Sequence, residues 1–135
     1  MQVLIDADNL DVPRLRLLVA ALEATPPGDV VIAGAPTALE AVDWPVQAQV
    51  LPATGWQGAD ILLARAYQTD GRPLLLATGD GDFAQLARRH PGIVLVVSGT
   101  SSRSRTFVGP RISTTDPAAD GGAQLRSWLD KQTML

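Results

Sequence analysis

The sequence contains no cysteine and a single histidine, His90, in 135 residues. It therefore has no disulfide framework, no thiolate zinc site and no cysteine nucleophile, and a Ser-His-Asp triad would have to use His90. We interpret His90, which ends a predicted helix beside Pro91, as a helix C-terminal residue far from any active edge. The absence of cysteine suits a reducing compartment, so we expect the chain in the cytoplasm.

Lysine is almost absent as well, with Lys131 as the single example, and no apolar run approaches the roughly 20 residues of a membrane-spanning helix. The first residues lack the basic flank and cleavage site of a signal peptide, and we expect no membrane partner. The net charge of −3 argues against binding nucleic acid through a broad basic surface. Basic contacts must come mainly from the ten arginines.

Apolar runs alternate with helical patterns along the chain, and 46% hydrophobic residues suffice for a core. The predicted strands are 3–5, 30–33, 46–51, 74–77 and 93–97, and the predicted helices between them include 12–24, 37–42 and 59–67. A strand-helix alternation of this kind predicts an α/β fold, in which helices cover both faces of a central parallel sheet of about five strands.

The composition of the sequence changes from apolar to polar after Val97, where residues 98–105 form a polar stretch with two arginines. Residues 106–108 and 111–113 suggest a further short strand interrupted by Gly109-Pro110, and 124–130 reads as a terminal helix. We therefore predict one domain over residues 1–135, with a core at 2–99 and a variable C-terminal segment at 100–135.

Aspartates gather where predicted strands end, and twelve of the fourteen acidic residues are Asp. Asp6 and Asp8 follow the first strand, Asp80 and Asp82 follow the 74–77 strand, and Asp60 stands at the start of a helix. Ligands of open parallel sheets bind beyond the carboxyl ends of the strands. Because carboxylates held together repel one another, a divalent cation is the physical reason to keep them there, and oxygen-only ligands favour Mg²⁺ or Mn²⁺.

Helix capping is the structural alternative, because a side-chain oxygen at an N-cap satisfies free backbone donors. The residues placed to act as caps are Asp8, Asn9, Asp11 and Asp82. Capping leaves Asp6 and Asp80, the acids closest to the strands, unexplained. No glycine-rich phosphate-binding motif follows any strand, which disfavours a dinucleotide or ATP site.

Three blocks of the sequence resemble the NYN-domain family of PIN-like ribonucleases. They run from Val3 to Leu10 (VLIDADNL), from Gly58 to Ala64 (GADILLA) and from Leu76 to Phe83 (LATGDGDF), within a likeness that covers about residues 2–99. The resemblance implies a three-layer α/β/α sandwich and Mg²⁺- or Mn²⁺-dependent cleavage of RNA.

The resemblance also implies roles for residues that match the family motifs. The implied metal-site and catalytic acids are Asp6, Asp60, Asp80 and Asp82, with Asn9 as a further catalytic residue and Thr78 as a substrate-binding hydroxyl. Two positions depart from the family pattern, because Gln57 stands where a lysine is common and Ala66 near where another acid is. Beyond Gly99 the likeness ends, which leaves Asp116 and Asp120 without a role.

We therefore predict a metal-dependent ribonuclease that hydrolyses RNA phosphodiester bonds with an activated water. Arg103 and Arg105 are candidates for binding the RNA backbone, with solvated loop charges as the alternative. Trp44 and Trp56 are candidates for stacking a base, with packing over the core as the alternative. A homo-oligomer that clamps RNA between copies is compatible with the sequence.

Two other functions remain open at this point. One is a catalytically silent RNA-binding or scaffold module with the same fold. The other is a phosphatase of the haloacid dehalogenase type, suggested by Asp6-Ala7-Asp8 after the first strand. That chemistry needs a Ser or Thr where Leu10 stands and a lysine in the middle of the chain, and both are missing.

Overall fold

The computed structural model describes residues 1–54 and 58–133, and at its centre lies one parallel sheet of six strands. The strands are β1 (Gln2–Asp6), β2 (Asp29–Gly34), β3 (Gln49–Pro52), β4 (Leu74–Ala77), β5 (Val94–Val97) and β6 (Ile112–Thr115). Each neighbouring pair runs parallel. The sheet has one strand more than the five predicted, because the segment after Gly99 returns to pair with β5.

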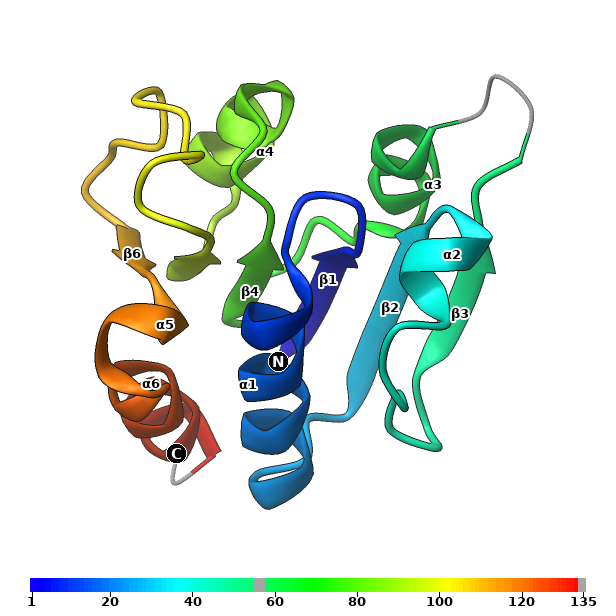
Figure 1. Ribbon diagram of the computed structural model, residues 1–135. Coiled ribbons are helices and arrows are strands. Elements are labelled where there is room, and N and C mark those ends of the chain that lie inside the picture. The colour runs from blue at the N-terminus through cyan, green and yellow to red at the C-terminus, as the bar shows by residue number, and fades with distance from the viewer. Residues whose placement is uncertain (55–57, 134–135) are drawn as a thin grey trace.

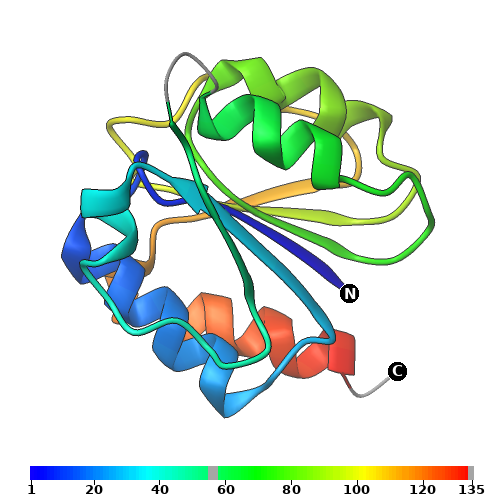
Figure 2. The ribbon, with the colours of Figure 1, turned by 90° about the vertical axis from the view of Figure 1, so that its right-hand side faces the viewer.

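Helices cover both faces of this sheet, as predicted. They are α1 (Val12–Ala24), α2 (Pro36–Leu39), α3 (Ala59–Ala66), α4 (Ala84–Arg89), α5 (Pro117–Asp120) and α6 (Ala123–Thr133), with a 3₁₀ turn η1 (Gly81–Phe83) before α4. Figure 2 shows α3 and α4 on one face and α1, α5 and α6 on the other, so the three-layer α/β/α arrangement is confirmed. None of the described helices is long and apolar enough to cross a membrane.

Alternate residues of each inner strand pack into two separate hydrophobic layers, one on each face of the sheet. In β1, Val3 and Ile5 pack with α1 and α6, whereas Leu4 packs with α3 and α4. All three side chains are at most 1% exposed. A strand buried on both faces reads as a continuous apolar run, which is why the sequence shows these strands clearly.

The strand order β3-β2-β1-β4-β5-β6 places β1 beside β4, although 67 residues separate the end of one from the start of the other. From β1 the chain winds outward through β2 and β3, and then returns to add β4, β5 and β6 on the other side (Figure 1). The strand order therefore reverses between β1 and β4. In an open parallel sheet, this switch point is where ligands bind.

Three predicted elements differ from the structure. The 37–42 helix is Pro36–Leu39, because Pro36 occupies its first turn. The 46–51 strand starts only at Gln49, because the backbone N–H of Ala48 closes a turn onto the Pro45 carbonyl. The prediction of a strand at 106–108 was wrong: Phe107 is buried against the α3–α4 layer instead, and β6 forms from 112–115.

Candidate active site

The carboxyl ends of β1 and β4 bring the first and third sequence blocks together. Ile5 of β1 is in register with Ala77 of β4, so the next residues, Asp6 and Thr78, lie side by side. The Thr78 hydroxyl donates a hydrogen bond to Oδ2 of Asp6 at 3.2 Å and accepts one from the backbone N–H of Asp80, also at 3.2 Å. Thr78 thus connects two of the predicted metal-site acids.

Asp6 is a buried carboxylate, with only 6% of its surface exposed. Its second oxygen, Oδ1, is buried and has no hydrogen-bond partner among the described residues. The pKa of Asp6 is raised from 3.8 to about 6, chiefly by burial. The charges of Asp8 and Asp80 also raise it, while the hydrogen bond from Thr78 and the backbone N–H of Asp8 act in the opposite direction.

Asn9 is the second link between the two strand ends. Its Oδ1 accepts a hydrogen bond of 2.6 Å from the backbone N–H of Gly79. Gly79 lies in a crowded position, since a Cβ there would sit 2.8 Å from the Ser102 carbonyl oxygen and 3.2 Å from the Asn9 side chain. A glycine is therefore required for the turn, the asparagine and the 99–111 loop to approach one another.

The capping alternative is confirmed for part of the acidic set. Asp11 accepts from the backbone of Arg14 and caps α1, whereas Asp8 does not cap α1 and accepts instead from the backbone N–H of Ala35 after β2. Asp80, and not Asp82, caps the η1 turn, because its Oδ1 accepts from the backbone of Asp82. Capping therefore accounts for one oxygen of Asp80, whereas Asp6, Asp60 and Asp82 cap no helix among the described residues.

Asp60 and Asp82 lie in a different part of the same edge. Both line a hollow between α3 and the η1–α4 segment, whose floor includes Ile61, Phe83 and Leu86. Across residues 1–54 and 58–133, no three Asp, Glu, His or Cys side chains are grouped closely enough to hold a metal ion. The structure thus joins Asp6, Asn9, Thr78 and Asp80, and leaves Asp60 and Asp82 beside them.

The loop between β5 and β6 folds over this edge. The backbone N–H of Ser104 donates to the Gly79 carbonyl at 2.8 Å, which holds the loop against the β4–η1 turn. Arg103 donates to Ser98 at the end of β5, from Nε to Oγ at 2.8 Å and from an amino group to the carbonyl oxygen at 3.3 Å. Arg105 is exposed. Of the two arginines, Arg103 fixes the loop and Arg105 faces solvent.

An ion pair that the sequence analysis missed anchors the start of the same loop. Asp116, which caps α5, receives two hydrogen bonds from the Arg14 guanidinium at 2.8 and 3.0 Å. It also accepts from the backbone and the hydroxyl of Thr100. The Arg14 hydrogen bond holds the pKa of Asp116 well below its usual range. Asp116 before Pro117 is a recognisable cap signal, but its pairing with α1 is not visible in the sequence.

The remaining candidates lie away from this edge or outside the described residues. Trp44 donates its indole N–H to the Leu39 carbonyl and packs against the α1 layer where strands begin, which supports core packing. His90 is fully buried between Tyr67 and the Arg72 carbonyl, each 2.6 Å from a ring nitrogen. Trp56 and Gln57 lie outside the described residues.

The carboxylate oxygens at this edge are the type of ligand that a hard divalent cation prefers. Asp6 offers a buried carboxylate oxygen without a partner, and the charge of Asp80 acts on it. No lysine or arginine forms an ion pair with Asp6, Asp8, Asp60, Asp80 or Asp82 among the described residues. A cation that met Asp6 Oδ1 would supply the positive charge that the chain itself does not provide there.

Comparisons of the chain with protein-family models, with curated proteins and with solved structures give no match.

Proposed function

We propose that this chain is a divalent-cation-dependent ribonuclease, with its active site where β1 meets β4. The observation that carries the proposal is Asp6, a buried carboxylate at the switch point of the sheet, one of whose oxygens has no partner among the described residues. A buried acid without a counter-charge is costly to the fold, so it is expected to serve a ligand. The resemblance of the three sequence blocks to NYN-domain ribonucleases supports this assignment.

In this proposal, Asp6 and Asp80 hold the cation, with Asp60 or Asp82 as a further ligand. When bound, Mg²⁺ or Mn²⁺ supplies charge neutralisation at the scissile phosphate and lowers the pKa of water. Thr78 orients Asp6 and fixes the Asp80 backbone, and Asn9 holds the Gly79 turn in place. The products expected are a 5′-phosphate and a 3′-hydroxyl, since water and not the ribose 2′-hydroxyl is the nucleophile.

The RNA chain is expected to run over the edge formed by the β4–η1 turn and the 99–111 loop. Arg105 is an exposed cation of that loop and is the candidate for a phosphate contact, whereas Arg111, also exposed, donates to the His90 and Arg88 carbonyl oxygens. Arg103 is occupied by Ser98 and keeps the loop folded. Replacing Arg105 by alanine should weaken RNA binding, whereas replacing Arg103 should also destabilise the loop.

The decisive experiment is cleavage of a 5′-labelled single-stranded RNA with Mn²⁺, comparing the wild type with Asp80→Asn. The variant keeps the cap of η1 through its side-chain carbonyl oxygen but loses the charge. We expect a loss of about a hundredfold or more, which corresponds to the several kcal/mol of charge stabilisation that a catalytic cation provides. Asp43→Asn, a change to an exposed acid without a side-chain hydrogen bond among the described residues, is the matched control.

A catalytically silent RNA-binding module is the second candidate, and one observation favours it. No three metal-ligating side chains converge in the described part of the chain, and an inactive module would have no need of them. RNA that binds without being cut, in the presence of Mn²⁺ and intact Asp6 and Asp80, would establish the silent module. Cleavage that survives in Asp80→Asn or in EDTA would show that the activity does not come from this site.

A further inference from the structure

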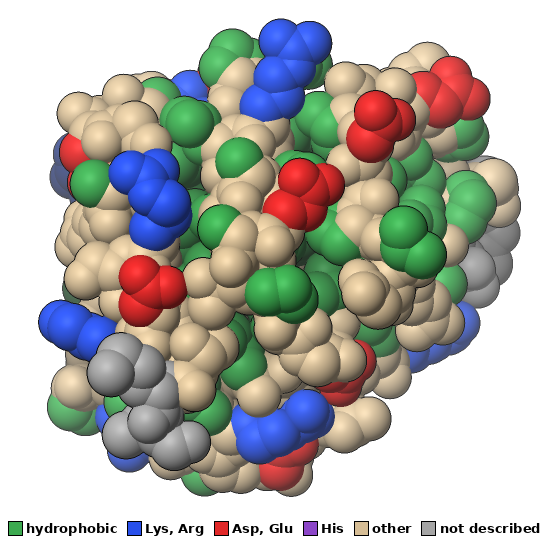
Figure 3. Space-filling model, turned by 90° about the horizontal axis from the view of Figure 1, so that it is seen from below, with side chains coloured by type: hydrophobic (Ala, Val, Ile, Leu, Met, Phe, Trp, Pro, Cys, Tyr) green, Lys and Arg blue, Asp and Glu red, His purple; other side chains and the backbone are tan. Residues whose placement is uncertain are grey.

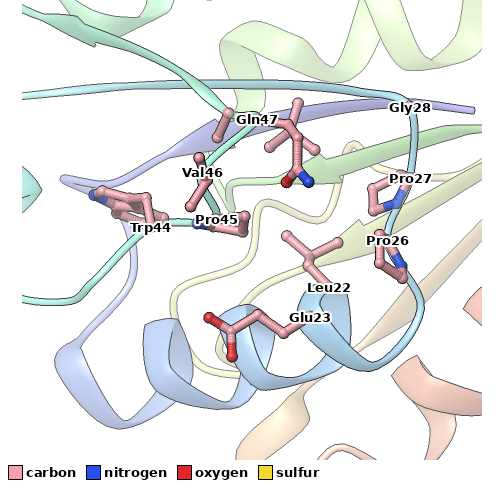
Figure 4. A pocket seen from close by; sticks show the side chains of 11 residues that line it. Leu22, Glu23, Pro26, Pro27, Gly28, Trp44, Pro45, Val46 and Gln47 are labelled. Atoms are coloured by element: carbon pink, nitrogen blue, oxygen red, sulfur yellow. The ribbon is translucent and has the colours of Figure 1, made fainter.

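A second hollow, which the proposed reaction does not use, lies at the opposite end of the molecule, where the strands begin. Its volume is about 270 Å³, and it is formed by the end of α1, the turn that follows and the segment before β3 (Figure 4). Figure 3 views this end and shows hydrophobic side chains in its recesses with charged side chains around them. We call it the basal groove, defined by Leu22, Glu23, Pro26, Pro27, Trp44 and Val46.

The basal groove is lined mainly by apolar side chains, with Gln47 as a polar side chain among them. Trp44 already donates its indole N–H to the Leu39 carbonyl at 2.9 Å, and the prolines have no N–H to give. Val46 is 98% exposed beside them. Small-molecule pockets usually measure about 300–1,000 Å³. A space of about 270 Å³ is therefore better suited to one or two apolar side chains than to a whole ligand.

The region that adjoins the basal groove at Glu23 is acidic. Glu23 also lines a shallower region along α1, together with Glu40, Asp43 and Arg16. None of these four charged groups forms an ion pair among the residues that the structure describes. Three carboxylates beside one guanidinium repel phosphate and attract lysine or arginine. This charge disfavours RNA and anionic lipid as the occupant.

The length of the adjoining acidic region along α1 limits the occupant further. Arg16 and Glu23 are seven helical residues apart, which is about 10 Å at 1.5 Å per residue. An extended peptide covers about 3.3 Å per residue, so three to four residues fill this length. A second copy of this chain, with a net charge of −3, is a poor electrostatic match.

We propose that the basal groove binds a short extended segment of a partner protein, which buries an apolar side chain beside Trp44 and places lysine or arginine against Glu23, Glu40 and Asp43. Charge complementarity selects this occupant, and hydrophobic contact with the proline and tryptophan surface anchors it. The site lies at the opposite end of the strands from Asp6, so it is independent of the proposed nuclease activity.

The test uses three acetylated and amidated tetrapeptides: Pro-Leu-Arg-Arg, Pro-Leu-Glu-Glu and Gly-Ser-Arg-Arg. Binding is followed by the NMR signal of the Trp44 indole N–H at low salt. We expect Pro-Leu-Arg-Arg to bind with a Kd on the order of 0.1–1 mM. The other two peptides should bind at least about tenfold more weakly, because Pro-Leu-Glu-Glu lacks the basic side chains and Gly-Ser-Arg-Arg lacks the apolar ones. Glu23→Gln should weaken binding about two- to fivefold, as expected for an exposed ion pair.

Gly28→Leu is the blocking variant, because Gly28 lines the groove and a Cβ there meets nothing within 4 Å. The added side chain should fill the groove without disturbing the fold and weaken Pro-Leu-Arg-Arg binding about tenfold or more. Gly71→Leu is the matched control, since Gly71 is equally open and does not line the groove. RNA cleavage should be the same in both variants.

Three results would overturn the proposal. One is equal binding of the basic and acidic peptides, and the second is unchanged binding in Gly28→Leu. The third is self-association in sedimentation that Gly28→Leu abolishes, because the occupant would then be a second copy. Failure of the nuclease assay leaves this proposal standing, and failure of the peptide assay leaves the nuclease proposal standing.

Discussion

Replacing Asp6 by asparagine should stabilise the protein above pH 6 in the absence of divalent cations. In the folded protein the pKa of Asp6 is about 6, whereas an unfolded chain has the ordinary value of 3.8. The folded state therefore binds the proton more tightly. The contribution of Asp6 to stability is fully present below about pH 4 and is lost as the pH rises through 6.

The size of the effect follows from the two pKa values. One pH unit corresponds to about 1.4 kcal/mol, so ionised Asp6 costs at most about 3 kcal/mol at pH 8. The side-chain carbonyl of the asparagine can still accept the hydrogen bond from Thr78. Because the asparagine side chain is uncharged, it is not repelled by the carboxylates of Asp8 and Asp80. We expect Asp6→Asn to raise the free energy of unfolding by about 1–3 kcal/mol at pH 8 and to change it little at pH 4.5.

Urea unfolding in EDTA, followed by tryptophan fluorescence at pH 4.5, 6 and 8, measures this difference. Asp43→Asn is the control and should leave the free energy of unfolding nearly unchanged, because Asp43 is exposed and its side chain forms no hydrogen bond among the described residues. Mn²⁺ at a hundred times its Kd should raise the free energy of unfolding of the wild type by about 2.7 kcal/mol at pH 8, and that of Asp6→Asn by much less. A variant that is less stable than the wild type at pH 8 would refute the reasoning.

Three further predictions concern the surroundings of the site. Gly79→Ala should cost about 1–3 kcal/mol by calorimetry, since its Cβ would overlap the Ser102 carbonyl; an unchanged Tm would contradict this close approach. Asp116→Asn should cost about 2–3 kcal/mol at pH 7 because it breaks the pair with Arg14. The lowered pKa of Asp116 means that this stability is present above about pH 4 and disappears as acid protonates the carboxyl, so the two proteins should converge in acid. Tyr67→Phe should lower the free energy of unfolding, measured with urea, by about 1–3 kcal/mol, because the buried histidine loses its hydrogen-bond partner; an unchanged urea midpoint would show that this hydrogen bond adds nothing.

The local elements could be predicted from the sequence because their signals lie within a few residues. The α1 helix spans Val12–Ala24 as predicted, since Asp11 caps it, Pro13 occupies its first turn, and Leu15 and Leu22 face the core. The inner strands were recognisable because burial on both faces requires continuous apolar runs. β6 was predicted only in part, at 111–113, because its four residues are only partly apolar and its pairing with β5 is a long-range contact.

The same distinction between local and long-range contacts applies to the candidate site. From the residues alone we could predict that Asp6 and Asp80 lie at the carboxyl ends of two strands, and that a glycine turn and an asparagine accompany them. The folded arrangement was needed to show that β1 and β4 are neighbours, that Thr78 bridges the two acids and that one oxygen of Asp6 is buried without a partner among the described residues. It also placed Asp60 with Asp82 in the hollow between α3 and the η1–α4 segment. Residue patterns specify local geometry, whereas burial and charge coupling depend on segments that meet only when the chain folds.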